Sequence, residues 1–237
     1  MRLVVLTTDT PHHLRFVQEI ARHTAVAHIL EETTGIKPPF DTAHPFETER
    51  EDYERSLWFS GGAPKLSDVA PVTRFANLND APAVDALAAL APDLTVVFGT
   101  RPLSAAVIDA AGPWPVNLHG GDPEAYRGLD THLWAIYHGD FANLITALHV
   151  VNPGIDDGAI IAALPLPLAR GMALHQLRAA NTEVCITLVR QAVDALRETG
   201  RIVARPQRAK GRYYSFMPAV LKEICVGKFG KHTGSLA

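Results

Sequence analysis

The chain has little cysteine, no excess of positive charge and no long uninterrupted hydrophobic run. Cys185 and Cys225 are the only two cysteines among 237 residues. Two thiols so far apart support neither a disulfide-stabilised scaffold nor a zinc knuckle. Cys185 stands in an apolar helical run, where a buried thiol is expected. We therefore expect no metal and a reducing, cytoplasmic environment.

The small net charge also disfavours some classes of binding partner. The 22 basic and 25 acidic residues give a formal net charge of −3, which leaves no broad cationic surface for nucleic acid. No charged start is followed by an apolar signal segment, and no apolar run is long enough to cross a bilayer. We therefore expect no nucleic-acid or membrane partner, and a small-molecule substrate is the class that remains.

Apolar runs with strand character alternate with helical segments along the first hundred residues. Leu3–Leu6, Val26–Leu30 and Leu94–Phe98 are continuous apolar runs typical of buried strands. Leu14–Ile20 has rough helical spacing, and Ala81–Ala91 is an alanine-rich helix candidate. This alternation predicts the α/β class, with an open, mostly parallel sheet and helices on both faces.

One stretch interrupts the alternation. Residues from about 31 to 67 contain three prolines and then a charged run, Glu47–Arg55, rich in helix-forming residues. We interpret the stretch as an insertion with one helix, whose carboxylates and arginines form a solvated face with i,i+4 pairs. The rest of residues 1–200 is expected to form the catalytic domain, and 201–237 a short C-terminal extension.

The second half of the chain continues the same pattern. Prolines 165 and 167 indicate that the last strand lies at a sheet edge, and Gly200 is placed to end the last helix. The expected strands are Val116–His119, Ile145–Val151 and Ile160–Leu168, and the expected helices are His132–Gly139 and Met172–Thr199.

Two polar residues at the end of one predicted strand are the candidate catalytic residues. Asn117 and His119 are two positions apart, so their side chains point to the same face of an extended segment. An amide donor and an imidazole can therefore converge on one carbonyl oxygen, and Asp156, in a glycine-flanked turn, could orient the imidazole. This set of groups is typical of acyl transfer.

At this point the sequence resembles the folate-dependent formyltransferases, whose motifs occur here in the same order and with the same spacing. The family signature runs Asn-x-His, Tyr-Arg-Gly, Trp-Ala-Ile and Asp-x-Gly. In this chain these are Asn117 with His119, Tyr126–Gly128, Trp134–Ile136 and Asp156–Gly158.

The resemblance implies 10-formyltetrahydrofolate as the formyl donor and a primary amine as the acceptor. Asn117 and His119 would stabilise the negatively charged oxygen of the tetrahedral intermediate, and Asp156 would hold His119 and help to relay the amine proton. The family pattern favours Asp156 over the adjacent Asp157, but the sequence leaves open which of the two faces His119.

The resemblance also suggests which residues bind the donor. The segment Arg101, Pro102 and Leu103 is similar to the loop with which glycinamide ribonucleotide transformylases hold the folate pterin ring, and Val151, Asn152 and Pro153 are the second expected folate-binding segment. The alternative for the first loop is an ordinary turn from strand to helix, with Pro102 near the first helical position.

The acceptor is inferred from departures from other members of the family. Few residues follow Gly200, which disfavours a tRNA-binding domain, and no glycine occurs in Thr7–His13, where the purine enzymes bind a phosphate. The remaining resemblance is to the nucleotide-sugar N-formyltransferases of O-antigen biosynthesis, which implies a nucleotide-linked amino deoxysugar as the acceptor.

Candidate acceptor-binding residues lie near both ends of the chain. Aromatic rings in the extension suit stacking on a nucleotide base, and the cations Arg208, Lys210 and Arg212 suit a diphosphate. The same rings could instead anchor the extension to the core. The candidate acceptor-binding residues are His12, His13, Arg127, Tyr213 and Tyr214.

Two alternative functions and the oligomeric state stay open. The enzyme could formylate another small amine, such as a hydroxylated ornithine in siderophore assembly or glycinamide ribonucleotide. It could also be a catalytically inactive, formyltransferase-like binding protein, although Asn117, His119 and the Asp-x-Gly motif are all present. The sequence does not decide whether the protein forms a homodimer.

Overall fold

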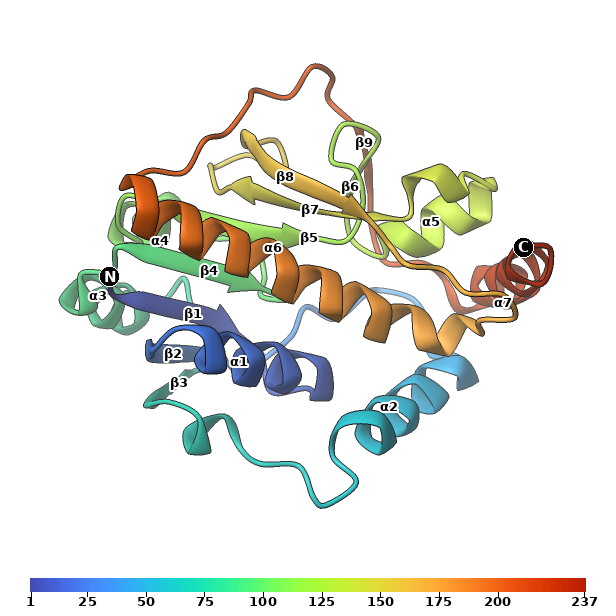
Figure 1. The fold of residues 1–237 in the computed structure, drawn as a ribbon, viewed down its shortest axis with the longest axis horizontal. Coiled ribbons are helices and arrows are strands. Elements are labelled where there is room, and N and C mark those ends of the chain that lie inside the picture. The colour runs from blue at the N-terminus through green and yellow to red at the C-terminus, as the bar shows by residue number, and fades with distance from the viewer.

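The central sheet is built from short runs of hydrophobic residues. In the computed structural model, which describes residues 1–237, β1 (Leu3–Thr7) and β4 (Leu94–Phe98) are buried at every position, as expected for strands covered on both faces. Seven strands lie in the order β3-β2-β1-β4-β5-β7-β8 (Figure 1). The other five are β2 (Val26–Glu32), β3 (Val72–Phe75), β5 (Pro115–His119), β7 (Ile145–Val150) and β8 (Ile160–Pro165).

The strand directions confirm the predicted class. β1 to β5 run parallel, whereas β7 and β8 are antiparallel to their neighbours. β8 forms one edge of the sheet, as its prolines predicted, although it ends at Pro165 and not at Leu168. The sheet is therefore open, mostly parallel and α/β.

Helices cover both faces of this sheet. α1 (Pro11–His23) and α6 (Leu177–Thr199) lie on one face, and α3 (Ala81–Leu90) and α4 (Ala105–Ala110) on the other (Figure 1). The larger hydrophobic core, of 36 buried residues, lies on the α1 and α6 face, and a core of nine lies on the α3 and α4 face. The more deeply packed face is thus the one that carries α1 and α6.

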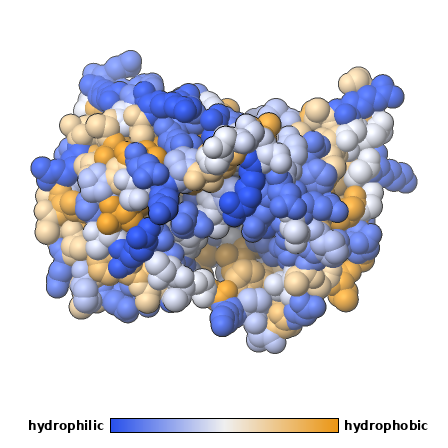
Figure 2. All heavy atoms as spheres, turned by 90° about the horizontal axis from the view of Figure 1, so that it is seen from below, coloured by the Kyte–Doolittle hydropathy of each residue, from blue (hydrophilic) through white to orange (hydrophobic).

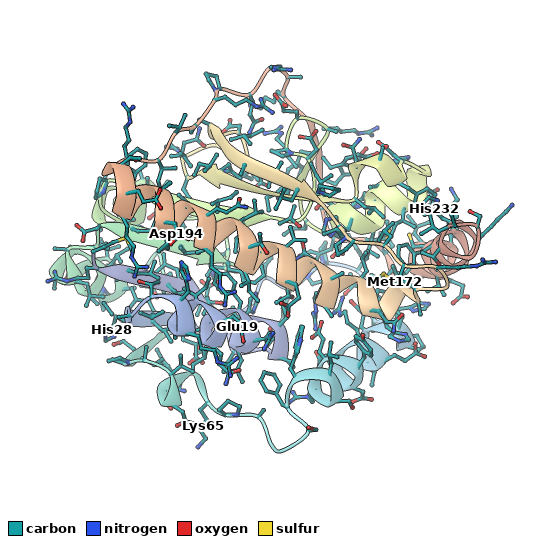
Figure 3. All side chains as sticks on the ribbon, in the orientation of Figure 1. Glu19, His28, Lys65, Met172, Asp194 and His232 are labelled. Atoms are coloured by element: carbon teal, nitrogen blue, oxygen red, sulfur yellow. The ribbon has the colours of Figure 1, made fainter.

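Ion pairs at the boundary of α1 and α6 hold these two helices together. Glu19 of α1 accepts a hydrogen bond of 2.9 Å from Arg190, and His23 lies 2.7 Å from Asp194. Glu19 and Asp194 both lie along this boundary (Figure 3). These exposed or half-exposed pairs set the relative position of the helices more than they stabilise them.

The C-terminal residues pack against the middle of the chain. β9 (Arg212–Tyr214) pairs in parallel with β6 (Tyr126–Gly128) in a second, two-stranded sheet, and α7 (Ala219–Gly234) packs on α5 (Thr131–His138). The ring of Tyr214 stacks on Trp134 with centroids 5.1 Å apart. Tyr214 therefore anchors this segment, as the alternative interpretation of the aromatic rings in the extension predicted.

Several elements differ from the expectations. The helix expected from Met172 begins at Leu177, because a 3-10 turn precedes it and the Gln176 side chain accepts a hydrogen bond from the Ala173 amide. α7 was not expected, because glycines 227, 230 and 234 lower its helix propensity. Strands β3, β6 and β9 and the 3-10 turns Leu66–Asp68, Phe141–Asn143 and Leu174–Gln176 were not expected either. Helix α4 follows β4 as the alternative interpretation of the Arg101–Leu103 loop predicted.

The predicted insertion contains the predicted helix, and most of its charged residues, such as Glu49, Glu51 and Arg55, are exposed as expected, but not all of them. α2 (Pro45–Trp58) buries Phe46 and Glu54, and the Glu54 side chain is 0% exposed. Both carboxylate oxygens of Glu54 accept hydrogen bonds of 2.7 Å from Arg178 of α6. A bidentate pair of this kind can be buried because each charge is compensated, so the interpretation of the acids as solvent-facing was wrong for Glu54.

Replacing Glu54 by Ala is expected to lower the free energy of unfolding by about 3–5 kcal/mol, because Arg178 would remain buried without its partner. Equilibrium unfolding in urea measures this difference. Glu51, exposed on the same helix, is the matched control, and Glu51→Ala should change stability by about 0.5 kcal/mol or less. Equal stability of the two variants would show that the Glu54 pair does not support the fold.

The face of the molecule that carries α2 is mostly polar. It shows charged and polar residues over most of its area, with hydrophobic residues in smaller groups (Figure 2). None of the helices combines the length and the hydrophobicity needed to span a membrane.

Candidate active site

A cavity of about 470 Å³ lies at the carboxyl ends of β4 and β5. Its size is typical of a site for a small molecule, and its position is the usual ligand site of an open α/β sheet. Residues of both hydrophobic cores border it, for example Leu103 from the α4 side and Leu177 from the α6 side. The cavity therefore extends past the carboxyl ends of the strands, from one face of the sheet to the other.

The three predicted catalytic residues meet at this cavity. Asn117 and His119 end β5, and the loop after β7 returns to bring Asp156 beside them. Asp156 Oδ2 is 3.4 Å from His119 Nδ1, and Asp156 Oδ1 is 3.5 Å from Asn117 Nδ2. The Gly128 amide donates a hydrogen bond of 2.8 Å to Asp156 Oδ2. The motif residues Asn117, His119, Gly128 and Asp156 thus form one cluster.

Asp156, and not Asp157, faces the imidazole. Asp157 lies 3.6 Å from Lys210 Nζ and next to Gly154, away from His119. The turn places Asp156 at a φ of +50°, a left-handed conformation that Asp and Asn tolerate better than most residues. The backbone of the turn thus decides which of the two adjacent acids points into the cluster.

A fourth polar residue, His149, completes the cluster and was not singled out from the sequence. It pairs with Asn117 across β5 and β7, and its Nε2 lies 3.2 Å from Asn117 Nδ2 and 3.4 Å from Asp156 Oδ1. Its Nδ1 is 2.9 Å from the Val150 carbonyl oxygen and donates a hydrogen bond to it. His149 stands out in the sequence as a polar residue within the expected strand Ile145–Val151. Its partner cannot be inferred there, because it depends on the register between two strands.

The protonation of the cluster follows from burial and charge. Burial lowers the pKa of His119, although the negative charge of Asp156 opposes that effect. Burial alone would raise the pKa of Asp156, but His149, His119 and the Gly128 amide together bring it to about 2. His119 Nε2 donates to the Tyr126 carbonyl oxygen at 2.7 Å. The neutral ring therefore has an unprotonated Nδ1 next to a carboxylate.

Both predicted folate-binding segments line the cavity. Arg101 is held by Glu32, which accepts from its backbone amide at 2.9 Å and from its Nε at 2.6 Å. Leu103 and Val151 pack against the smaller core. Gly99, at a φ of +80°, lets the first loop turn where a Cβ atom would lie 2.2 Å from the His13 ring. All six predicted residues, Arg101, Pro102, Leu103, Val151, Asn152 and Pro153, border the cavity.

Only some of the predicted acceptor-binding residues border the cavity. His12 and the half-exposed Tyr213 border the cavity, whereas His13, Arg127 and Tyr214 do not. Arg127 donates to the Gly211 and Ile155 carbonyl oxygens at 2.7 and 2.9 Å, so it ties the extension to the Asp156 loop.

The two adjacent histidines are deeply buried. Burial, His13 and the charges of Arg178 and Arg50 lower the pKa of His12 well below its ordinary value, and burial lowers the pKa of His13 to about 3. Both rings are therefore neutral near pH 7 and add no positive charge for a phosphate. The predicted diphosphate cations Arg208, Lys210 and Arg212 do not border the cavity either.

The fold is of the open α/β class, and an amide, an imidazole and a carboxylate meet at one cavity. Residues 1–184 match the family described as formyl transferase, and the chain belongs to this family. A methionyl-tRNA formyltransferase from Rhodopirellula baltica is 30% identical over 129 residues, which cover 54% of this chain and 38% of that protein. The matched region spans about two fifths of the length of such curated relatives.

Solved structures confirm the fold. A sugar N-formyltransferase from a Shewanella species covers 96% of this chain and 87% of its own, with 14% identity and a TM-score of 0.62. The formyltransferase PseJ from Anoxybacillus kamchatkensis, solved with a UDP-linked formamido sugar and tetrahydrofolate, covers 90% of this chain and 85% of its own, with 16% identity and a TM-score of 0.53.

Proposed function

We propose that the protein is a 10-formyltetrahydrofolate-dependent N-formyltransferase that acts on the amino group of a nucleotide-linked amino deoxysugar. The observation that carries this proposal is the cluster of Asn117, His119 and Asp156 at the rim of a cavity. It combines an amide, an imidazole and a carboxylate where an amine and a formyl group could meet.

The part of the cavity on the α4 side suits the folate donor. Leu103, Val151 and Ile155 provide apolar walls for a flat ring system, and the Gly99 turn brings backbone close to the cavity. When bound, the donor supplies a formyl carbon attached to nitrogen. Arg101 would contribute mainly by holding the loop, because Glu32 already occupies its amide and its Nε.

The cluster can stabilise charge and accept a proton. The Asn117 amide makes long hydrogen bonds of 3.2 and 3.5 Å to His149 and Asp156, so it can redirect a hydrogen to the formyl oxygen as negative charge develops there. His119 Nδ1 can accept the proton of the attacking amine, because the resulting imidazolium would face Asp156 and keep its bond to Tyr126. The same proton can then pass to the departing folate nitrogen.

The proposal of a sugar acceptor has two supports. Two proteins that share the fold are a sugar N-formyltransferase and an enzyme solved with a UDP-linked sugar and tetrahydrofolate. In this chain, Tyr213 places a half-exposed ring at the cavity, where it can stack on a nucleotide base. We expect the reaction to take place in the cytoplasm, where nucleotide sugars are made.

The test is tetrahydrofolate release from 10-formyltetrahydrofolate together with mass spectrometry of the acceptor. The acceptor panel contains dTDP- and GDP-linked 4-amino sugars, a hydroxylated ornithine, glycinamide ribonucleotide and methionyl-tRNA. We expect formylation of a nucleotide-linked amino sugar and no reaction with the corresponding hydroxy sugar. Formylation of only another amine would refute the sugar assignment, and folate binding without transfer to any amine would indicate an inactive binding protein.

A further inference from the structure

The part of the cavity on the α6 side has a different character from the folate side. His12, Phe46, Arg50, Leu177 and Arg178 border it. Two of these residues, Arg50 from α2 and Arg178 from α6, are arginines, and the third arginine of the cavity, Arg101, is bound to Glu32 on the other side. The α6 side therefore contributes two guanidinium groups to the cavity that also contains the catalytic cluster.

Arg50 lies over the Phe46 ring, 5.6 Å from its centroid, but it lacks the hydrogen-bond partners that a largely buried arginine normally has. Its side chain is only 19% exposed, it makes no hydrogen bond to the protein, and its Nε is buried without a partner. Its nearest carboxylate oxygen is Glu47 Oε1, 3.7 Å from an Nη2 atom. The same Glu47 oxygen is 3.0 Å from the buried Lys222 Nζ. The guanidinium of Arg50, which has five donors, thus forms a single ion pair within 4 Å, and that pair is long and shared with Lys222.

Arg178 is fixed in place but keeps donors free. Glu54 binds its Nε and one of its Nη atoms, Nη2, and leaves Nη1 without a protein partner. The side chain is 20% exposed and borders the cavity. Because Glu54 is fully buried, it holds the guanidinium in one orientation, which reduces the entropy lost when an anion binds.

The other carboxylates near Arg50 form no ion pair with it and have partners of their own, Arg178 for Glu54 and the Met217 amide for Asp130. Burial and the Arg178 charge lower the pKa of Arg50, and the charges of Glu47, Glu54 and Asp130 offset only part of that effect. Asp130 also borders the cavity, but burial raises its pKa and its Oδ2 accepts a hydrogen bond of 2.8 Å from the Met217 amide. His12 is neutral. The unused donors therefore belong to Arg50 and Arg178.

We infer that Arg50 and Nη1 of Arg178 form an oxyanion subsite that binds a phosphate or carboxylate group of the acceptor. Assigning the anion to the acceptor rests on the proposed formyl transfer, because the predicted folate segments occupy the other side of the cavity. Planar guanidinium groups suit both oxyanions. A nucleotide-linked sugar would place its diphosphate here, and an amino acid its carboxylate.

Isothermal titration calorimetry of the full chain with inorganic pyrophosphate and with acetate, at constant ionic strength, tests the subsite. We expect one of the two probes to bind the unsubstituted protein, and Arg50→Gln to weaken that binding at least tenfold. Preference for pyrophosphate would indicate a phosphate group and preference for acetate a carboxylate. Arg55, exposed on the same helix, is the matched control, and Arg55→Gln should change the affinity less than twofold.

A second measurement separates ligand binding from a structural role. Without added anion, Arg50→Gln should have the same or a higher melting temperature, because the substitution removes a poorly compensated buried charge. A lower melting temperature with unchanged anion affinity would overturn the inference, as would the absence of binding by either probe.

The subsite and the proposed function can fail separately. Binding of 10-formyltetrahydrofolate should be the same in Arg50→Gln and the unsubstituted protein. If an acceptor is found, Arg50→Gln should raise its KM at least tenfold with little change in kcat, and Arg50→Lys should recover part of the loss. Formyl transfer with an unchanged KM would refute the subsite alone. Failure of transfer to every amine, with anion binding still dependent on Arg50, would refute the proposed function alone.

Discussion

Replacing His119 by Gln should lower kcat for formyl transfer by about 10²–10⁴-fold, the usual contribution of a positioned acid or base. The reason is that glutamine can keep the hydrogen bond to the Tyr126 carbonyl oxygen but cannot accept the amine proton next to Asp156. Stopped assays of tetrahydrofolate release, with the acceptor at saturation, measure the effect. Circular dichroism should show the same fold for the variant and the unsubstituted protein.

His132 is the matched control for His119. It is another histidine that borders the cavity, its Nε2 is 2.6 Å from the Ile145 carbonyl oxygen, and burial lowers its pKa to about 4. It has no carboxylate partner in the cluster, so His132→Gln should cost less than about tenfold in kcat. Near-normal turnover of His119→Gln, or equal losses in both variants, would remove the assignment of His119 as the proton acceptor.

Asp156→Asn should reduce kcat by about as much as loss of the corresponding carboxylate in other acid–base clusters, about 10⁴-fold. The substitution removes the negative charge that would stabilise protonated His119, while an amide oxygen can still accept the Gly128 hydrogen bond. Asparagine also tolerates the positive φ at this position. The loss should therefore appear in turnover and not in stability.

Asp157→Asn is the control for this prediction, because the two acids are adjacent and only Asp156 contacts the histidines. We expect Asp157→Asn to change kcat less than about tenfold, since its charge pairs at 3.6 Å with the exposed Lys210. A damaging Asp157 variant beside an active Asp156 variant would place the catalytic carboxylate one residue later.

The sequence was most informative about features that depend on neighbouring residues, such as buried strands, the direction of side chains along a strand and helix ends. The continuous apolar runs at Leu3–Leu6 and Leu94–Phe98 predicted buried parallel strands, and both strands are buried at every position. The two-residue spacing of Asn117 and His119 placed both side chains on one face of β5, because side chains alternate along a strand. Gly200 ends α6 at a φ of +71°, as its position predicted.

The same patterns did not reveal partners that are distant in the chain. His149 joins Asn117 only through the antiparallel register of β5 and β7, and a shift of one residue would turn it to the opposite face. The charges of α2 follow a solvent-exposed pattern, yet Glu54 is buried because Arg178 reaches it from a helix more than a hundred residues away. No local propensity encodes that pairing.

By itself, the sequence determined the α/β class, most of the central strands and the chemical groups of the site, because hydrophobic periodicity and short motifs depend on neighbouring residues. Only the tertiary structure decided that Asp156 and not Asp157 faces His119, that His149 joins them, and that Arg50 is buried without a close counter-ion. These outcomes depend on strand register, on the backbone of one turn and on packing between helices, which are properties of the folded chain as a whole.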